Sequence, residues 1–417
     1  MVKISLRVSM IIIGDELLNA KINDLNLQIL AKEIAPLGFS FKKCTVLGDK
    51  FDQVTNEIQK QSKENDILII TGGLGPTKDD LTKSIIANAL GVSLVENELA
   101  REYAIKQYAN FGREWSKENS HYHMMPEGSL PLYNPAGMAP GIHAKVDKCE
   151  VFCTPGVPRE CQAMVRETIV PMLKDRAQSG HELFICRTHS IPEETIFFKL
   201  CPNLWETLEE FGKVSSLPII SGVDITVDLR PEHQNDESRQ RLKAILEETP
   251  LKDNIWTYGP RNIEEVIVHE ASAKGLTIGF AESCTGGLAS STITDVSGSS
   301  AVFLGSVVSY ANSIKESIIH VKEETLKENG AVSIETASEM ANGARKSLGA
   351  DIVISYTGIA GPGGATPGKP VGTVCIGVAT KNGVSASRYE FRGDRKRLKN
   401  KFCQQGLIDL LNEIRSS

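Results

Sequence analysis

Apolar runs alternate with helical patterns from the start of the chain to about residue 173. Short apolar runs at residues 8–13, 66–71 and 150–154 have the length and boundaries of buried strands. Between and after them, apolar side chains recur at helical spacing, which predicts helices at residues 25–38, 80–90 and 158–173. This alternation is typical of a parallel α/β sheet.

The pattern changes between residues 184 and 258. Residues 193–200 are predicted to be helical, residues 223–229 alternate like a half-exposed strand, and residues 237–248 form a charged helix. This segment carries no catalytic cluster in its sequence, so we interpret it as a small α+β unit that acts as a spacer or a dimerisation module. Gly259 and Pro260 interrupt both helix and strand and predict a linker at residues 256–262.

The alternation of strands and helices resumes after this linker. Strands are predicted at residues 276–280, 302–310, 351–356 and 372–379, and helices at residues 263–274, 288–296, 333–348 and 397–411. The expected fold class is therefore α/β. Two α/β domains, residues 1–175 and 256–417, are joined by a small α+β middle domain at residues 176–255.

Composition narrows the class of protein. A chain of 417 residues is too long for one ordinary core, and 41% hydrophobic with 24% charged residues is typical of a soluble globular protein. The net charge of −6 argues against a nucleic-acid partner. The apolar run at residues 10–13 is too short for a signal or a membrane span, so we expect a cytoplasmic protein without a membrane partner. The nine cysteines are scattered without zinc spacing, and disulfides are not expected in that compartment.

Two polar segments, residues 14–18 and 71–80, follow the first two predicted strands. Both should lie at the carboxyl edge of the sheet. The residues suited to approach a phosphate there are Gly72, Gly73, Gly75 and Thr77. Mg²⁺ takes oxygen ligands and shares them with substrate phosphates, and the candidate ligands are Asp15, Glu16, Asp79 and Asp80. The alternative, that Asp79 or Asp80 only caps the following helix, stays open at this point.

A second candidate site begins at the decapeptide of residues 280–289, which contains Ser283, Cys284 and Thr285. These residues follow a predicted strand, at the sheet edge where α/β proteins bind ligands, and the next helix would offer N–H groups to an anion. Other chemically useful side chains follow neighbouring strands or begin the last helix: Tyr310, Asn312, Lys315, Thr357, Arg395 and Arg397. Hydroxyls, a lysine, arginines and a glycine-rich loop at residues 358–364 suit a phosphorylated polar substrate.

The N-terminal motifs resemble the CinA (competence/damage-inducible) family, with its molybdopterin-binding-like domain. They are Gly-Asp-Glu-Leu-Leu at 14–18, Gly-Gly-Leu-Gly-Pro-Thr-Lys-Asp-Asp at 72–80, Asn-Pro-Ala-Gly-Met-Ala-Pro-Gly at 134–141 and Pro-Gly-Val-Pro at 155–158. The resemblance implies an ADP-ribose pyrophosphatase activity that depends on a divalent metal such as Mg²⁺. The chain departs from the family at Ala20, where glycine is usual, and at Met138, where threonine is usual.

The C-terminal motifs resemble the nicotinamide mononucleotide deamidase module of the same family. They are residues 281–287, Tyr-x-Asn-x-x-Lys at 310–315, Thr-Gly-Ile-Ala-Gly-Pro-Gly-Gly at 357–364, residues 369–373 and residues 393–395. The resemblance implies hydrolysis of nicotinamide mononucleotide to nicotinate mononucleotide and ammonia, without a cofactor.

Hydrolysis of an amide needs a nucleophile, a base and an oxyanion donor. We expect Ser283 to attack, Lys315 to accept its proton after partial burial has neutralised it, and Tyr310 to relay that proton or hold the lysine. Cys284 is the rival nucleophile, and Glu282 is interpreted as a support or cap. The remaining expected roles are oxyanion binding at Thr285, Gly286 and Gly287, pocket formation and substrate contact at Asn312, Thr357, Gly358 and Gly361, and phosphate binding at Arg397 with Arg395.

The leading prediction is a homodimeric enzyme of pyridine nucleotide salvage with two activities. Its partners would be the small molecules nicotinamide mononucleotide and ADP-ribose. One alternative keeps only the N-terminal pyrophosphatase active. Another is a non-enzymatic nucleotide-binding factor in competence or DNA damage. The set Ser283, Tyr310, Lys315 and Thr357 argues against both alternatives, because a binding module has little use for a serine and a lysine at strand ends.

Overall fold

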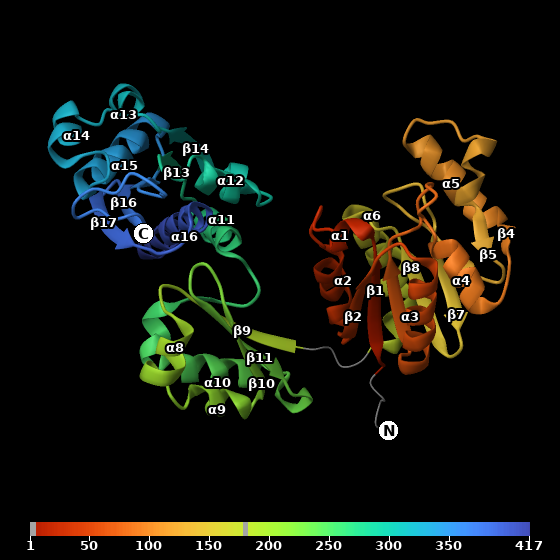
Figure 1. Ribbon diagram of the computed structural model, residues 1–417. Coiled ribbons are helices and arrows are strands. Elements are labelled where there is room, and N and C mark those ends of the chain that lie inside the picture. The colour runs from red at the N-terminus through yellow and green to blue at the C-terminus, as the bar shows by residue number, and fades with distance from the viewer. Residues whose placement is uncertain (1–5, 178–181) are drawn as a thin grey trace. The chain divides into compact units, whose positions relative to one another are not determined.

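The computed structural model describes residues 6–177 and 182–417, and their contacts separate two compact units, Met1–His181 and Glu182–Ser417 (Figure 1). The α/β fold class is confirmed. The sequence predicted three segments, whereas the structure groups the middle segment with the C-terminal one in the second unit.

The first unit is built on a six-stranded sheet with the order β2-β1-β3-β8-β7-β6. Four strands are parallel: β1 (Val8–Ile13), β2 (Phe41–Leu47), β3 (Ile67–Thr71) and β8 (Cys149–Thr154). β7 (Gly141–Val146) and β6 (Leu130–Leu132) extend the sheet with two antiparallel strands that the sequence analysis did not predict. β4 (Leu94–Glu96) and β5 (Met124–Pro126) form a separate ribbon.

Helices cover both faces of this sheet, which explains why every residue of β1 is buried. Successive side chains of a strand point to opposite faces. Accordingly, Ile11 and Ile13 belong to one core cluster, whereas Met10 and Ile12 belong to another. The helices of the unit are α1 (Asp15–Leu18), α2 (Asn26–Ile34), α3 (Phe51–Glu64), α4 (Thr82–Leu90), α5 (Glu98–Asn110), α6 (Pro158–Met164) and α7 (Val170–Leu173).

The second unit starts with an antiparallel four-stranded sheet of the order β10-β11-β9-β12. Its strands are β9 (Glu182–Thr188), β10 (Gly212–Pro218), β11 (Val223–Leu229) and β12 (Ile255–Tyr258), and its helices are α8 (Glu193–Thr195), α9 (Leu204–Glu209) and α10 (Asp236–Glu247). The predicted linker begins too early, because Thr257 and Tyr258 pair with β9 and Trp256 is buried.

The C-terminal sheet has five strands in the order β14-β13-β15-β16-β17. β13 (Ile278–Glu282), β14 (Phe303–Val308) and β15 (Ile352–Gly358) are parallel, and β16 (Thr373–Thr380) and β17 (Gly383–Glu390) are antiparallel. Its helices are α11 (Ile263–Lys274), α12 (Leu288–Thr294), α13 (Asn312–Ile319), α14 (Glu323–Asn329), α15 (Ile334–Leu348) and α16 (Arg395–Ser416). Within the described ranges of both units, no helix has the length and apolar character that a membrane span requires.

Candidate functional site

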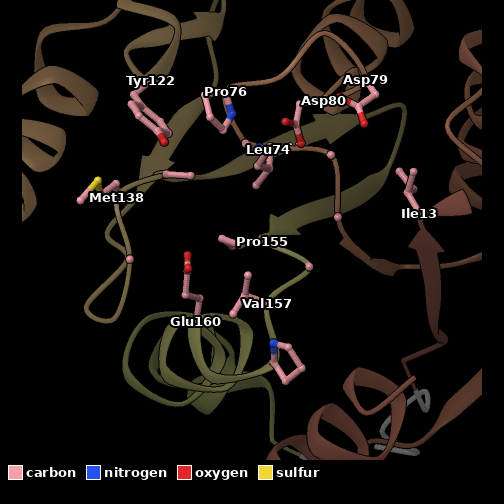
Figure 2. A pocket seen from close by; sticks show the side chains of 18 of the residues that line it. Ile13, Leu74, Pro76, Asp79, Asp80, Tyr122, Met138, Pro155, Val157 and Glu160 are labelled. Atoms are coloured by element: carbon pink, nitrogen blue, oxygen red, sulfur yellow. Dashed lines mark hydrogen bonds between the residues drawn. The ribbon is translucent and has the colours of Figure 1, made fainter. Parts of the chain in front are cut away.

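A cavity of about 700 Å³ lies at the carboxyl edge of the N-terminal sheet (Figure 2). The loops after β1, β3 and β8 line it, and Gly72, Gly73 and Gly75 are among the lining residues as the sequence predicted. Gly72 has φ +105°, and a Cβ there would lie 2.2 Å from the carbonyl oxygen of Ile13. Only glycine allows the backbone to pass so close to the first strand.

Asp80 organises the loop that follows β3. One of its carboxylate oxygens accepts a hydrogen bond from the Gly75 N–H (2.8 Å), and the other accepts bonds from the Thr77 N–H (2.8 Å) and hydroxyl (2.5 Å). The Thr77 side chain therefore braces the loop. It does not line the cavity, although the sequence predicted that it would approach a phosphate there. Since α4 begins at Thr82 without a side-chain cap, Asp80 closes this loop and does not cap the helix.

The acidic residues around the cavity differ in part from the predicted set. Glu16, Asp79 and Asp80 line it together with Asp49, whereas the Asp15 side chain lies against Gly48. Burial, together with the negative charges of Asp15, Glu16 and Asp79, raises the pKa of Asp49. Sequence reasoning missed Asp49, although it follows β2 at the same sheet edge, which is a usable signal.

These carboxylates do not form a metal cage by themselves. In residues 6–177 and 182–417, no group of three or more His, Cys, Asp or Glu side chains is placed to hold a metal ion. Mg²⁺ commonly takes one or two protein carboxylates and completes its shell with water and substrate phosphates. The donors Glu16 and Asp79 beside the glycine loop fit that kind of site, and the predicted metal stays a prediction.

The segment after α5 closes the other side of the cavity with Phe111, Arg113 and Tyr122. Lys83 holds this segment, because its buried Nζ donates to the carbonyl oxygens of His121 (2.7 Å) and Tyr122 (3.0 Å). Burial lowers the pKa of Lys83 to about 8. Sequence analysis did not identify any of these residues, because no motif marks them.

Both departures from the family pattern have a structural consequence. Ala20 follows α1 with a φ of +54°, in the left-handed region that favours glycine. Met138 lines the cavity, so a thioether stands where the family usually has a hydroxyl.

In the C-terminal sheet, Ser283 and Lys315 form a buried pair. Ser283 follows β13, and Lys315 lies on α13 with 1% of its surface exposed. The Nζ atom donates to the carbonyl oxygens of Ser309 (2.8 Å) and Tyr310 (3.2 Å) and lies 3.1 Å from the Ser283 Oγ. Burial lowers the pKa of Lys315 from its ordinary value of 10.5. The structure therefore brings together the predicted nucleophile and base.

Glu282 supports the turn that carries Ser283. Its buried carboxylate accepts hydrogen bonds from the N–H groups of Gly287 (2.8 Å), Ala289 (3.2 Å) and Ser290 (2.9 Å), and from the Ser290 hydroxyl (2.5 Å). The predicted role of Glu282 as a cap is confirmed. Glu282 thus occupies three of the N–H groups at the start of α12, so the expectation that these groups are offered to an anion is wrong.

The oxyanion donors were also predicted in part incorrectly. The Gly286 N–H donates to the Ser283 carbonyl (3.2 Å) and the Gly287 N–H to Glu282, so neither is available to a ligand. Both glycines have positive φ values, +63° and +93°, which the tight turn requires. In the described chain, the N–H groups of Cys284 and Thr285 donate to no backbone oxygen, and both face the Cys284 sulfur.

Cys284 is packed into the hydrophobic core beneath the turn. Burial raises the pKa of its thiol to about 12, and a thiol rather than a thiolate is a weak nucleophile. Ser283 has the nearby amine that Cys284 would need, so the geometry supports the serine.

A cavity of about 200 Å³ opens onto the pair Ser283 and Lys315. The Tyr310 phenol lies at its rim, 62% exposed, and accepts a hydrogen bond from the Arg395 guanidinium (3.3 Å). Because Tyr310 reaches Lys315 only through its carbonyl, the predicted proton relay through the phenol does not fit this geometry. The alternative prediction, that Tyr310 holds the lysine, fits through its backbone. The other lining residues are Cys284, Asn312, Ala331, Val332, Thr357, Gly358, Ala360 and Arg395.

Thr357 and the glycines near it shape this cavity. The Thr357 hydroxyl donates to the Ala331 carbonyl (2.5 Å), which ties residues 331–332 to the cavity wall. A Cβ on Gly358 would lie 2.7 Å from the Thr373 carbonyl oxygen, so the strand pairing requires glycine there. The Gly361 carbonyl accepts a hydrogen bond from Arg395 (2.7 Å). Thr357 is therefore a wall residue, and its hydroxyl is already used.

The two predicted phosphate-binding arginines are placed differently. Arg395 lines the cavity, whereas the exposed Arg397 side chain is outside its lining and the Arg397 backbone N–H donates to Asp394 (2.9 Å). Lys399 is a cation that the sequence analysis missed, and its Nζ lies 3.8 Å from where a Cβ on Gly286 would stand. One turn of α16 separates Lys399 from Arg395, and this spacing was the signal available in the sequence.

Fold and site together define an α/β protein with a buried serine–lysine pair at the carboxyl edge of its last sheet. Residues 260–414 match the CinA C-terminal domain, and residues 9–175 match the probable molybdopterin binding domain. A CinA-like protein of Thermotoga maritima is 35% identical over 97% of both chains, and one of Geobacter metallireducens is 34% identical over 94% of this chain and 96% of its own. This chain therefore belongs to the CinA family.

Two solved structures of related proteins each cover a little over a third of this chain. A competence/damage-inducible protein of Agrobacterium tumefaciens is 36% identical and covers 38% of this chain and 99% of its own, with a TM-score of 0.35. A CinA superfamily protein of Klebsiella pneumoniae is 28% identical over 38% of this chain and 100% of its own, with a TM-score of 0.37.

Proposed function

We propose that the C-terminal domain hydrolyses the carboxamide of nicotinamide mononucleotide to nicotinate mononucleotide and ammonia. The observation that carries this proposal is the environment of the Lys315 Nζ, which has two carbonyl oxygens and the Ser283 hydroxyl as neighbours. A neutral amine has two hydrogens and one lone pair. The two carbonyls take the hydrogens, which leaves the lone pair to accept the proton of Ser283.

The reaction then follows the serine–lysine scheme. Ser283 Oγ attacks the amide carbon as its proton moves to Lys315, and the N–H of Cys284 stabilises the oxyanion that forms. Lys315 returns the proton to the amide nitrogen, the C–N bond breaks and ammonia leaves. Water, deprotonated by Lys315, hydrolyses the resulting serine ester and releases the acid.

The dimensions and charges of the cavity agree with this substrate. A cavity of about 200 Å³ accommodates the pyridine ring and its amide, while the rest of the mononucleotide extends past its mouth. Arg395 at the rim and Lys399 beside Gly286 supply positive charge for the 5′-phosphate.

The decisive test is ammonia release from nicotinamide mononucleotide by the purified full-length protein, with and without EDTA. We expect release at an equal rate in both conditions, because this site uses only its own side chains. Absence of release from folded protein would contradict the proposal and favour the N-terminal pyrophosphatase alone or a binding-only role in competence or DNA damage. Loss of release in EDTA would contradict the metal-free serine–lysine mechanism.

A second proposed activity, the hydrolysis of ADP-ribose, is supported by the N-terminal cavity with its glycine loop beside Glu16 and Asp79. These carboxylates would hold a divalent cation, which neutralises charge on a diphosphate. We expect ADP-ribose hydrolysis that requires Mg²⁺ and that Glu16→Gln removes, with Glu127→Gln as a control on an exposed glutamate of the same unit. Metal-independent turnover, or full activity of the Glu16 variant, would refute it.

We also propose that the protein works in the cytoplasm as a homodimer on small nucleotides rather than on nucleic acid. The negative net charge of −6 supports the choice of ligand. Light scattering coupled to gel filtration tests the dimer, and a monomeric mass would refute it.

A further inference from the structure

One carboxyl group in the N-terminal cavity lies away from the acidic edge of the sheet, which is formed by Glu16, Asp49, Asp79 and Asp80. Glu160 lies on α6 and points into the cavity, opposite Pro76, Asp79 and Asp80 (Figure 2). No motif assigned it a role. Its position raises the question of what a carboxylate does at the far end of a phosphate pocket.

Buried polar contacts hold this carboxyl group in place. The Asn134 side-chain amide donates to one Glu160 oxygen (2.8 Å) and to the Ala139 carbonyl (3.0 Å). Asn134 is itself 2% exposed and is fixed further by the Ala136 N–H, which donates to its side-chain oxygen (3.1 Å). The group is therefore positioned before any ligand arrives.

Gly137 provides the room for Glu160. A Cβ on Gly137 would lie 2.0 Å from the oxygen that Asn134 binds. The other Glu160 oxygen accepts no hydrogen bond within the described residues and is left for a ligand. Two independent observations thus point to a built acceptor: a fixed carboxyl group and a glycine that makes space for it.

The negative charge of the Glu160 carboxylate determines which part of a ligand can bind beside it. A carboxylate repels a phosphate, and phosphates are favoured at the glycine loop across the cavity. Val157 lies beside Glu160, and Leu74, Tyr122 and Met138 also line the cavity (Figure 2). These apolar and aromatic walls suit a base or a sugar face. Burial raises the pKa of Glu160, which makes its carboxylate a more basic acceptor.

We infer that Glu160 accepts a hydrogen bond from a neutral donor on the nucleoside end of a nucleotide, either the ribose hydroxyls or the amino group of adenine. This inference rests on the proposed function of the N-terminal cavity and adds a specificity-determining residue to it. The glycine loop, with a cation held at the acidic edge, would bind the diphosphate, and Glu160 would bind the nucleoside through a hydrogen bond.

The test is calorimetric titration of the full-length protein, in Mg²⁺, with AMP, 2′,3′-dideoxy-AMP, inosine monophosphate and inorganic pyrophosphate. If Glu160 binds the ribose hydroxyls, wild-type protein should bind AMP about tenfold more tightly than 2′,3′-dideoxy-AMP. If Glu160 binds the adenine amino group, wild-type protein should bind AMP about tenfold more tightly than inosine monophosphate. Glu160→Ala should weaken AMP binding about tenfold, abolish the discrimination and leave pyrophosphate binding unchanged.

A second cavity variant shows whether a loss of binding in Glu160→Ala comes from misfolding, and a variant at an exposed glutamate controls for effects of mutation outside the cavity. Gly137→Ala keeps the carboxyl group but displaces it, so it should show the same loss, whereas Glu127→Ala should match the wild type. Unchanged AMP binding in both cavity variants, or an equal loss of pyrophosphate binding, overturns the inference while ADP-ribose hydrolysis still stands. If the wild type binds neither AMP nor pyrophosphate, both the inference and the proposed N-terminal function fail.

Discussion

The Nζ atom of Lys315 lies 3.1 Å from the Oγ atom of Ser283, although the two residues are 32 positions apart. The sheet order explains this contact. Ser283 follows β13 and Lys315 lies on α13, the helix after β14, and these two strands are parallel neighbours. The two side chains are therefore close together, because they follow the carboxyl ends of adjacent parallel strands. A pair held by the backbone of two adjacent strands is well suited to chemistry that depends on a fixed distance.

Replacing Ser283 should abolish ammonia release, whereas replacing Cys284 should not. Ser283→Ala removes the group that attacks the amide, and a loss of about 10³-fold or more in kcat is expected. Cys284→Ala removes a protonated core thiol, so kcat should change only a few-fold. The measurement is the rate of ammonia release by both variants. Activity that survives Ser283→Ala and disappears in Cys284→Ala would identify the thiol as the nucleophile.

The rate of deamidation should rise with pH as Lys315 loses its proton. Burial lowers the pKa of this lysine below 10.5, so the rising limb of kcat against pH should lie below that value. Lys315→Met should lose about 10³-fold in kcat and lose the limb as well. Lys322→Met, at an exposed position, is the matched control. A rising limb that persists in Lys315→Met would assign the titration to another group.

Arg395 should matter for substrate binding, whereas Arg397 should not. Arg395→Met removes the cation that lines the cavity, and an increase of about tenfold or more in KM for the mononucleotide is expected. Arg397→Met alters an exposed side chain outside the cavity and should leave KM within about twofold. Steady-state kinetics of both variants separates these roles. The reverse ranking would restore the prediction made from the sequence.

The strands and glycine loops could be predicted because their signals are local. Buried runs such as residues 8–13 and 276–280, the second of which the structure places two residues later at Ile278–Glu282, have a periodicity that indicates strands, and the turn glycines have a backbone conformation that favours glycine. Glu282 could also be predicted as a cap, since its partners lie within eight positions.

Directions of side chains at the sheet edge could not be predicted in the same way. Whether the Tyr310 phenol or its carbonyl faces Lys315 depends on how the chain leaves β14, and the same is true of Arg395 and Arg397 on α16. Glu160 reaches its cavity only through the packing of distant segments, so neighbouring residues carry no signal of it.

Glu282→Ala should destabilise the C-terminal domain strongly. The buried carboxylate accepts four hydrogen bonds, and removing it leaves their donors without a partner, at an expected cost of about 3–5 kcal/mol in the free energy of unfolding. Glu265→Ala is the matched control, because this exposed glutamate caps α11 and should cost about 1 kcal/mol. Urea unfolding of both variants measures the difference. Equal costs would mean that solvent replaces the Glu282 contacts.

Ala20→Gly should stabilise the N-terminal unit, against the usual effect of glycine. Ala20 has a φ of +54°, and left-handed backbone costs a residue with a Cβ about 1–2 kcal/mol. Glycine loses about 0.5–1 kcal/mol more conformational entropy on folding, so the net gain should be about 0.5–1 kcal/mol. Ala31→Gly, inside α2, is the control and should lower stability by about 1 kcal/mol. Urea unfolding followed by tryptophan fluorescence compares the two variants. If both are equally destabilised, the left-handed strain at Ala20 does not govern stability, and glycine is favoured at this position for the phosphate loops instead.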